Sequence, residues 1–254
     1  MSSLLWHFRN ELRRGLYMSR RYWVEAMVGT GMMLGLFGGL LYAVLSISGK
    51  NVASGEVDGL ILGFALWMFA NGAFAGAPTD VMEETEQRGL EQLCLAPLPL
   101  SVLLSLRIVR RMIGSAMMML LTLWLIEFFT GQRLQPHYFA TLGLALLAAP
   151  ALTGVGVVLA GAVLMVKKGQ MMVAAAYPLL IAIVALPAYP VNGFALLPYA
   201  LGAASAKALT AGAVLPLSVW ILIALNSIGY LFIGLWAFRL LLRRAKRRGV
   251  LGHI

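Results

Sequence analysis

The sequence predicts an all-α integral membrane protein with six transmembrane helices, and three observations carry this prediction. Hydrophobic residues make up 61% of the 254 residues, the mean hydropathy is +0.85, and only 12% of the residues are charged. Such a chain has more apolar surface than a water-soluble core can bury, so the bilayer must be its main solvent. Because a helix needs ~20 apolar residues to cross a hydrocarbon core of ~30 Å, we expect a single transmembrane domain over residues 1–254.

Apolar stretches of suitable length alternate with short polar segments along the chain. The expected spans are 22–48, 59–78, 113–130, 138–166, 171–187 and 215–242. Lys and Arg gather where basic residues mark the cytoplasmic side of a membrane protein, and this placement explains the net charge of +10 without a nucleic acid partner. With both termini in the cytoplasm, only three of the 20 Lys and Arg residues lie outside: Lys50, Arg133 and Lys207. We therefore expect a multi-pass protein of the bacterial inner membrane.

Residues 1–21 predict an amphipathic helix on the inner membrane surface. Leu5, Leu12 and Leu16 recur at helical spacing on one side, whereas Arg9 and Arg13 fall mostly elsewhere around the helix. The chain runs from this helix directly into the first span, which argues against an ordinary soluble helix.

The segment 194–213 is apolar enough for a further span, but Pro198, Gly202 and Gly212 interrupt it. A crossing here would place the basic tail, residues 243–254, outside the cell, against the positive-inside tendency. We therefore expect an outer re-entrant pair of short helices before the last span, packed against protein or water.

The first span carries glycines at intervals of four, Gly31, Gly35 and Gly39. This spacing aligns three positions without side chains on one helix face, so another helix can approach closely. The stripe is a possible subunit interface.

Polar side chains within the expected spans are few. Glu25 and Glu127 are the only carboxylates there, and the simpler interpretation is contact with headgroups or local pairing. Glu127 lies beside two Phe residues and could instead line a transport pathway. Asn71 is a second possible pathway residue, although Asn71 and Asn226 also fit interhelical hydrogen bonding.

The sequence offers no catalytic, cofactor-binding or metal site. The three His residues lie near different membrane borders and no two are paired on a helix. Gly49-Lys50-Asn51 does not fit a phosphate-binding loop, so this chain is not expected to be an enzyme or to hydrolyse ATP alone. The lone Cys94 cannot form an intrachain disulfide.

An acidic segment, residues 79–99, lies between the second and third spans and holds five of the ten acidic residues. Asp80 and Glu83 predict a helix start in which each side chain caps the other's backbone. A cytoplasmic amphipathic helix between two spans is a place where another protein can bind and exert force on the spans. A solvated loop helix without a partner is the alternative.

This segment resembles the coupling helix of ABC type-2 permeases, also called type V ABC exporters. That family shows two acidic residues, then Gly, a small residue, Leu-Glu-x-Leu and a Pro. The residues that match in register are Glu84, Glu86, Leu90, Glu91, Leu93 and Pro97. Gly89 departs from the pattern because it lies one place later than usual. The order of entry helix, six spans, re-entrant pair and basic ending agrees with this family over nearly the whole chain.

The resemblance implies the permease subunit of an ATP-driven exporter, which forms the pathway for an amphipathic or lipid-like cargo. It implies pairing with a second permease subunit, identical or related, and docking of two separate ATP-binding subunits that hold ATP and Mg. The implied ATPase-coupling residues are Glu84, Glu86, Gly89, Leu90, Glu91, Leu93 and Pro97. Residues 90–99 also resemble haem-exporter permeases of cytochrome c maturation.

Two alternatives come from other functional classes. A non-transporting membrane scaffold or assembly factor would use the acidic helix to recruit a cytoplasmic partner without ATP-driven cycling. An ion-coupled secondary transporter would show charges at the midplane or a repeat between the halves, and the sequence has neither.

Overall fold

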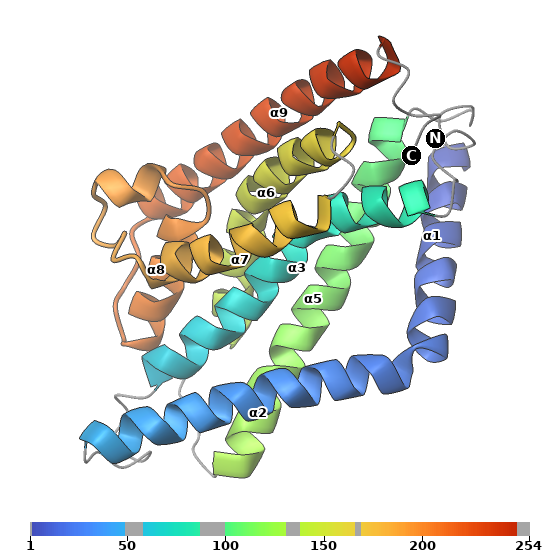
Figure 1. Cartoon of the computed structure of the whole chain (residues 1–254). Coiled ribbons are helices and arrows are strands. Elements are labelled where there is room, and N and C mark those ends of the chain that lie inside the picture. Colours follow the sequence, from blue (N-terminus) through green and yellow to red (C-terminus); the bar gives the residue numbers. More distant parts are fainter. Residues whose placement is uncertain (1, 49–57, 87–99, 131–137, 166–168, 248–254) are drawn as a thin grey trace.

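The computed structural model describes residues 2–48, 58–86, 100–130, 138–165 and 169–247, and this part of the chain is helical with no strand. The elements in chain order are α1 (Ser2–Arg21), α2 (Trp23–Ser48), α3 (Asp58–Glu86), α5 (Leu100–Thr130), α6 (Tyr138–Val163), α7 (Gly169–Ala185), the short 3-10 helix η2 (Gly193–Leu196), α8 (Ala200–Thr210) and α9 (Leu217–Arg247) (Figure 1). The predicted all-α fold class is confirmed for these residues.

Five helices in the described ranges are long and apolar enough to cross a membrane: α2, α3, α5, α6 and α9. Helix α7 is apolar but has only 17 residues, so the sixth span stays a prediction. Large apolar side chains such as Met32, Phe232 and Trp236 are more than half exposed on these helices. Extended apolar surface of this kind is rare on water-soluble proteins and is expected where a helix faces lipid.

Helix α3 lies at the centre of the molecule, where it packs against α5, α6, α7 and α8 (Figure 1). Its apolar stretch is 56% buried, whereas that of α2 is only 6% buried. Ile61, Leu66 and Phe69 are fully enclosed and form the middle of the main hydrophobic core. The burial of α3 explains why it is apolar around most of its circumference.

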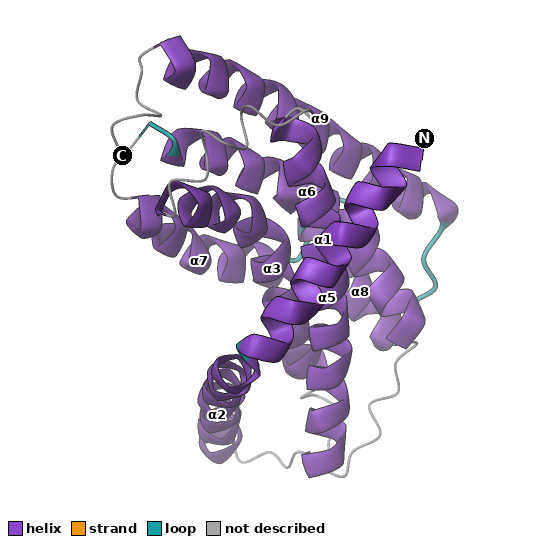
Figure 2. Ribbon diagram, turned by 90° about the vertical axis from the view of Figure 1, so that its right-hand side faces the viewer, coloured by secondary structure: helices purple, strands orange, loops and turns teal. Residues whose placement is uncertain are grey.

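Helices α6 and α9 run side by side, and glycine makes their close approach possible (Figures 1 and 2). A Cβ atom on Gly154 would overlap the carbonyl of Tyr230, and one on Gly234 would overlap the carbonyl of Gly154. Positions without side chains let the two backbones come into contact, which is how helices pack when lipid offers no hydrophobic driving force between them.

Helix α3 continues through Pro78 to Glu86, so the predicted helix start at Asp80 is wrong, whereas the predicted membrane border at Pro78 stays a prediction. Proline has no N–H to donate to the carbonyl four residues earlier, which here belongs to Phe74. Gly156 of α6 lies against that carbonyl so closely that a Cβ atom there would overlap it. Packing by a neighbouring helix is what allows proline inside a membrane helix, and α6 supplies it.

The two short helices predicted for residues 194–213 are present as η2 and α8, and hydrogen bonds fasten them to the longer helices. Asn226 of α9 donates to the carbonyls of Ala195 at 3.3 Å and Leu196 at 3.0 Å. Tyr199 Oη, buried before α8, donates to Leu66 O of α3 at 3.3 Å. The interhelical role predicted for Asn226 is confirmed, whereas re-entry of this segment into the outer leaflet stays a prediction.

Helices α1 and α2 lie at the edge of the molecule. In Figure 2, α1 leans along α5, and α2 stands apart from the remaining helices. One aromatic contact joins α2 to α3, where the rings of Phe37 and Phe64 stack with centroids 3.9 Å apart. Leu16, on the predicted apolar side of α1, is 67% exposed. The described part of the chain therefore leaves much of α2 and this position of α1 uncovered.

Candidate functional site: a charged junction of α1, α3 and α5

Side chains of opposite charge from three helices meet where α1, the end of α3 and the beginning of α5 come together. We call this group the charged junction. It consists of Glu11 and Arg14 from α1, Asp80, Glu83 and Glu84 from α3, and Arg107, Arg110 and Arg111 from α5. Most of these residues line a cavity of about 390 Å³.

Helical spacing brings these charges together. Residues three and four apart lie on the same side of a helix, so Asp80, Glu83 and Glu84 share one face of α3. Arg107, Arg110 and Arg111 share one face of α5 by the same spacing. Because α3 and α5 pack against each other, the acidic face of one helix meets the basic face of the other.

Arg107 lies at the centre of the charged junction. Its Nη1 is 2.7 Å from Oε1 of Glu84, and its Nε is 3.6 Å from Oε1 of Glu11. The Arg107 side chain is only 4% exposed. One buried guanidinium therefore bridges carboxylates from α1 and α3.

A second ion pair joins α3 to α5. Nε of Arg111 donates to Oδ1 of Asp80 at 3.1 Å, and Nη2 of Arg111 donates to the same oxygen. Asp80 is 3% exposed, and its other oxygen is buried without a hydrogen-bond partner. Glu83 is 3.8 Å from Arg111, but its side chain is 63% exposed. Glu83 thus forms the solvent-facing rim of the junction, and Asp80 forms its interior.

Arg14 adds a direct link from α1 to the end of α3. Its Nη2 is 3.5 Å from Oε1 of Glu84, the same oxygen that contacts Arg107. Nη1 of Arg14 is also 3.9 Å from Glu11. Glu84 is therefore held by two guanidinium groups that come from different helices.

Gly15 explains how α1 comes so close to α5. A Cβ atom at this position would lie 2.7 Å from Nη1 and 2.8 Å from Cδ of Arg110. Gly15 is buried, and the Arg110 side chain occupies the space beside it. Nε of Arg110 is buried without a hydrogen-bond partner. A larger residue at position 15 would displace the Arg110 side chain from this space.

The charged junction is suited to holding three helices in one arrangement. A buried ion pair adds little net stability compared with apolar packing, but removing one partner is costly because a buried charge is left alone. Such a group favours one relative position of the helices over others. Within the described ranges no three metal-ligating side chains come together.

The predicted ATPase-coupling residues are divided by the structure. Glu84 lies in the charged junction, and Glu86 is the last residue of α3. The remaining predicted coupling residues lie outside the described ranges: Gly89, Leu90, Glu91, Leu93 and Pro97. Their role stays a prediction, but the segment that contains them follows directly from the helix end that Arg14 and Arg107 hold.

The predicted glycine stripe of α2 faces open space. A Cβ atom on Gly31, Gly35 or Gly39 would meet no other atom within 4 Å. In the described ranges, the stripe is therefore not used for packing within the chain, and its use as a subunit interface stays a prediction.

The two possible pathway residues lie on different helices. Asn71 is half-buried in α3, and its Oδ1 is buried without a hydrogen-bond partner. Glu127 is half-buried near the end of α5. Their role in a pathway stays a prediction. Glu25, which the sequence offers as an interfacial carboxylate, lines the cavity of the charged junction.

Sequence reasoning did not identify Arg107, Glu11 or the pairing of Asp80 with Arg111. The arginines of α5 have an ordinary explanation as charges at a membrane border. The available signal was the complementary spacing, in which acidic residues at i, i+3 and i+4 end one span and arginines at similar spacing begin the next.

Comparison of the chain with models of known protein families, with curated proteins and with solved structures found no significant match.

Proposed function

We propose that this chain is the membrane-spanning permease subunit of an ATP-driven exporter similar to the ABC type-2 permeases. In this proposal α2, α3, α5, α6, α7 and α9 form six spans, and both termini lie in the cytoplasm. Two separate ATP-binding subunits dock at the cytoplasmic side and bind ATP and Mg, whereas this chain hydrolyses nothing itself.

The order of the helices supports this proposal. An N-terminal helix with basic residues precedes the first apolar helix, a short helical pair precedes the last one, and a basic segment ends the chain. In Figure 1 the end of α3, the beginning of α5 and the end of α9 lie toward the upper right, and α8 lies at the left. Basic residues gather at that upper-right end, which the positive-inside tendency assigns to the cytoplasm.

The observation that carries the proposal is the position of Glu84. This residue belongs to the motif that resembles the coupling helix, and it is also held by Arg14 of α1 and Arg107 of α5. A force applied by an ATPase to residues 87–99 would reach the end of α3 first. The two arginines would then transmit the displacement to α1 and α5, so the ATPase could move three helices together.

The cargo pathway and the second permease subunit complete the proposal. The open face of α2 with Gly31, Gly35 and Gly39 is available for an identical or related permease. Asn71 and Glu127 are the polar candidates for the pathway of an amphipathic or lipid-like cargo. A haem-exporter-like permease is a narrower form of the same proposal.

The test is purification of the tagged protein in mild detergent, followed by mass spectrometry of its partners and an ATPase assay. We expect an ATP-binding subunit in stoichiometric amount and ATP turnover that vanadate inhibits. A folded protein that reproducibly purifies without such a subunit would refute the exporter proposal. Recovery of a different cytoplasmic partner would favour the scaffold or assembly-factor alternative.

A pair of charge reversals tests the coupling residues. We expect Glu91→Lys to abolish association with the ATPase while membrane insertion is unchanged, because the resemblance places this residue at the ATPase contact. Glu56→Lys makes the same charge change in the loop between the first two spans and should leave association intact. Normal complex formation and normal stimulated turnover in Glu91→Lys would show that the motif match is a coincidence.

A further inference from the structure

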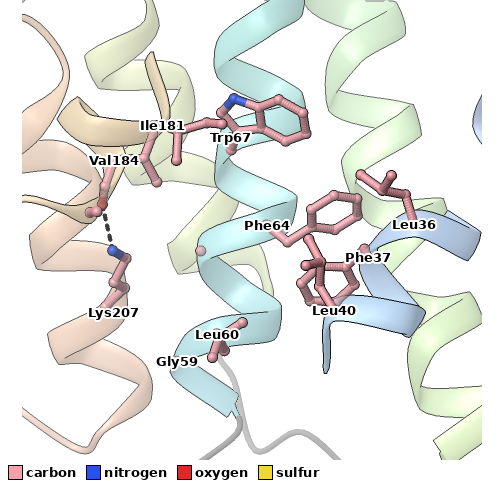
Figure 3. Close-up of a pocket in the computed structure, with 12 residues that line it drawn as sticks. Leu36, Phe37, Leu40, Gly59, Leu60, Phe64, Trp67, Ile181, Val184 and Lys207 are labelled. Carbon is pink, nitrogen blue, oxygen red and sulfur yellow. Dashed lines mark hydrogen bonds between the residues drawn. The ribbon is translucent and has the colours of Figure 1, made fainter. Parts of the chain in front are cut away.

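A second cavity, of about 360 Å³, lies between α2, α3, α7 and α8 and shares no lining residue with the cavity of the charged junction (Figure 3). Its walls are almost entirely apolar. Phe37 and Phe64 form the side toward α2, Trp67 lies over the middle, and Ile181 of α7 closes another side. Leu36, Leu40 and Ile181 are each more than half exposed. The cavity therefore opens to the surface between helices, where a membrane protein meets lipid.

One charged side chain, Lys207 of α8, lines this apolar cavity. Its Nζ donates one hydrogen bond, to the carbonyl of Val184 (Figure 3). An ammonium group has three N–H donors, so two remain for another acceptor. Burying a cation in apolar surroundings is costly unless an opposite charge compensates it. Among the residues that the structure describes, no carboxylate lines the cavity.

A glycine of α3 lies beside the ammonium group. Gly63 of α3 faces Lys207, and a Cβ atom there would lie 3.7 Å from Cε and 4.0 Å from Nζ of the lysine. The absence of a side chain at position 63 thus keeps the space beside the ammonium group open. The cavity therefore offers one ammonium group, that of Lys207, in an otherwise apolar lining.

We propose that this cavity binds an anionic lipid, with an oxygen of its headgroup on Lys207 and an acyl chain along Phe64, Phe37 and the leucines of α2. Charge complementarity selects this occupant. In a zwitterionic lipid the phosphate is already balanced by the lipid's own ammonium group, so such a lipid compensates the lysine less well than an anionic lipid does, and a small inorganic anion would leave the apolar walls uncovered. The volume also falls in the range of small-molecule sites, about 300–1,000 Å³. This proposal depends on the chain being in a membrane but not on its being an exporter.

The test uses quenching of tryptophan fluorescence by dibrominated lipids in reconstituted membranes. Because the chain has six Trp residues, the signal of Trp67 is obtained as the difference between the wild type and Trp67→Phe. The probes are dibrominated phosphatidylglycerol and dibrominated phosphatidylcholine with identical chains. We expect Trp67 to be quenched by phosphatidylglycerol at a relative affinity about tenfold above that for phosphatidylcholine, the size expected of one charge-assisted hydrogen bond.

Three variants make the result specific. Lys207→Gln should remove the preference for phosphatidylglycerol, whereas Arg243→Gln removes one positive charge from an exposed position of α9, a helix that does not line the cavity, and should keep it. Gly63→Leu should fill the space beside the ammonium group and weaken quenching by both lipids, and it keeps the proposal testable if Lys207→Gln does not fold. An equal preference in the wild type and Lys207→Gln, or no preference in the wild type, would overturn the proposal.

Two other occupants would be recognised in the same experiment. Displacement of the phosphatidylglycerol signal by millimolar inorganic phosphate would identify a soluble anion site and refute the lipid site. Absence of Trp67 quenching by either lipid, together with crosslinking between two copies through α2, would show that a second copy of the chain covers the cavity. Loss of an ATPase partner would leave the lipid preference unchanged, so this proposal and the exporter proposal fail independently.

Discussion

Substitution of Arg107 should destabilise the protein more than substitution of either carboxylate around it. Arg107 contacts Glu84 at 2.7 Å and Glu11 at 3.6 Å, and its side chain is 4% exposed. Arg107→Gln removes the buried cation and leaves Glu84 and Glu11 with only the half-exposed Arg14 as a counter-charge. Glu84→Gln removes one charge, and the amide oxygen that replaces the carboxylate can still accept a hydrogen bond from Arg107.

The magnitudes follow from burial. Removing one partner of a buried ion pair costs about 3–5 kcal/mol, which we expect for Arg107→Gln. For Glu84→Gln we expect about 2 kcal/mol, the value of a hydrogen bond to a charged group. Glu83→Gln is the matched control because it makes the same chemical change on the next residue, where the side chain is 63% exposed. An exposed pair contributes less than about 1 kcal/mol.

The assay is thermal unfolding of the purified protein in one detergent at neutral pH. For a chain of this size we expect the Tm to fall by on the order of 10 °C for Arg107→Gln and about 5 °C for Glu84→Gln. The double variant should lose less than the sum of the single variants, by about 1–2 kcal/mol, because the two residues contact each other. Equal effects of Glu83→Gln and Glu84→Gln, or strict additivity of the double variant, would refute the assignment of Arg107 as the centre of the junction.

Two further predictions concern helix packing. Gly234→Ala should lower the free energy of unfolding by about 1–3 kcal/mol, because the added Cβ would overlap the carbonyl of Gly154. Gly229→Ala is on the same helix, but nothing lies within 4 Å of the added atom, so this variant should be neutral or slightly stabilising. Equal stability losses of the two variants in thermal unfolding would contradict the close contact of α6 with α9. Asn226→Leu should raise protease cleavage and hydrogen exchange around η2, because the carbonyl of Ala195 loses its side-chain donor and that of Leu196 keeps only Tyr230, at a cost of about 1–3 kcal/mol. Tyr230→Phe removes one hydrogen bond to η2 and should have the smaller effect. If protection of η2 from hydrogen exchange is unchanged in Asn226→Leu, other contacts hold η2 in place.

The positions of the apolar helices could be predicted from the sequence because each depends on local composition. The first expected span, 22–48, agrees with α2, and the short helices expected near residue 200 are present. Proline positions predicted the helix ends less well. Pro78 did not end α3, and at the carbonyl that lacks its hydrogen bond α3 packs closely against Gly156 of another helix. Such a contact involves residues distant in the chain, so local sequence patterns cannot predict it.

The charged junction illustrates the same limit at the candidate site. Glu84 was identified through its motif, but the guanidinium groups that hold it were not. Whether Arg107 is a border charge or a buried bridge depends on the rotation of α5 relative to α3, which sequence spacing alone does not determine. The cavity around Lys207 was also not predicted, because the sequence placed that residue among the outward-facing charges, in the re-entrant segment, and gave no sign that Gly63 faces it.

The close contact of α6 with α9 also has a consequence for biosynthesis. Helix α9 is the last helix of the described chain. The face of α6 that carries Gly154 therefore cannot pack against α9 until residues 217–247 have been translated. Helix α2, by contrast, emerges early and has little surface that requires a neighbour within the described chain. A ribosome-bound intermediate that lacks α9 should therefore expose a glycine-lined groove on α6, and occupation of that groove by the newly inserted helix completes the fold.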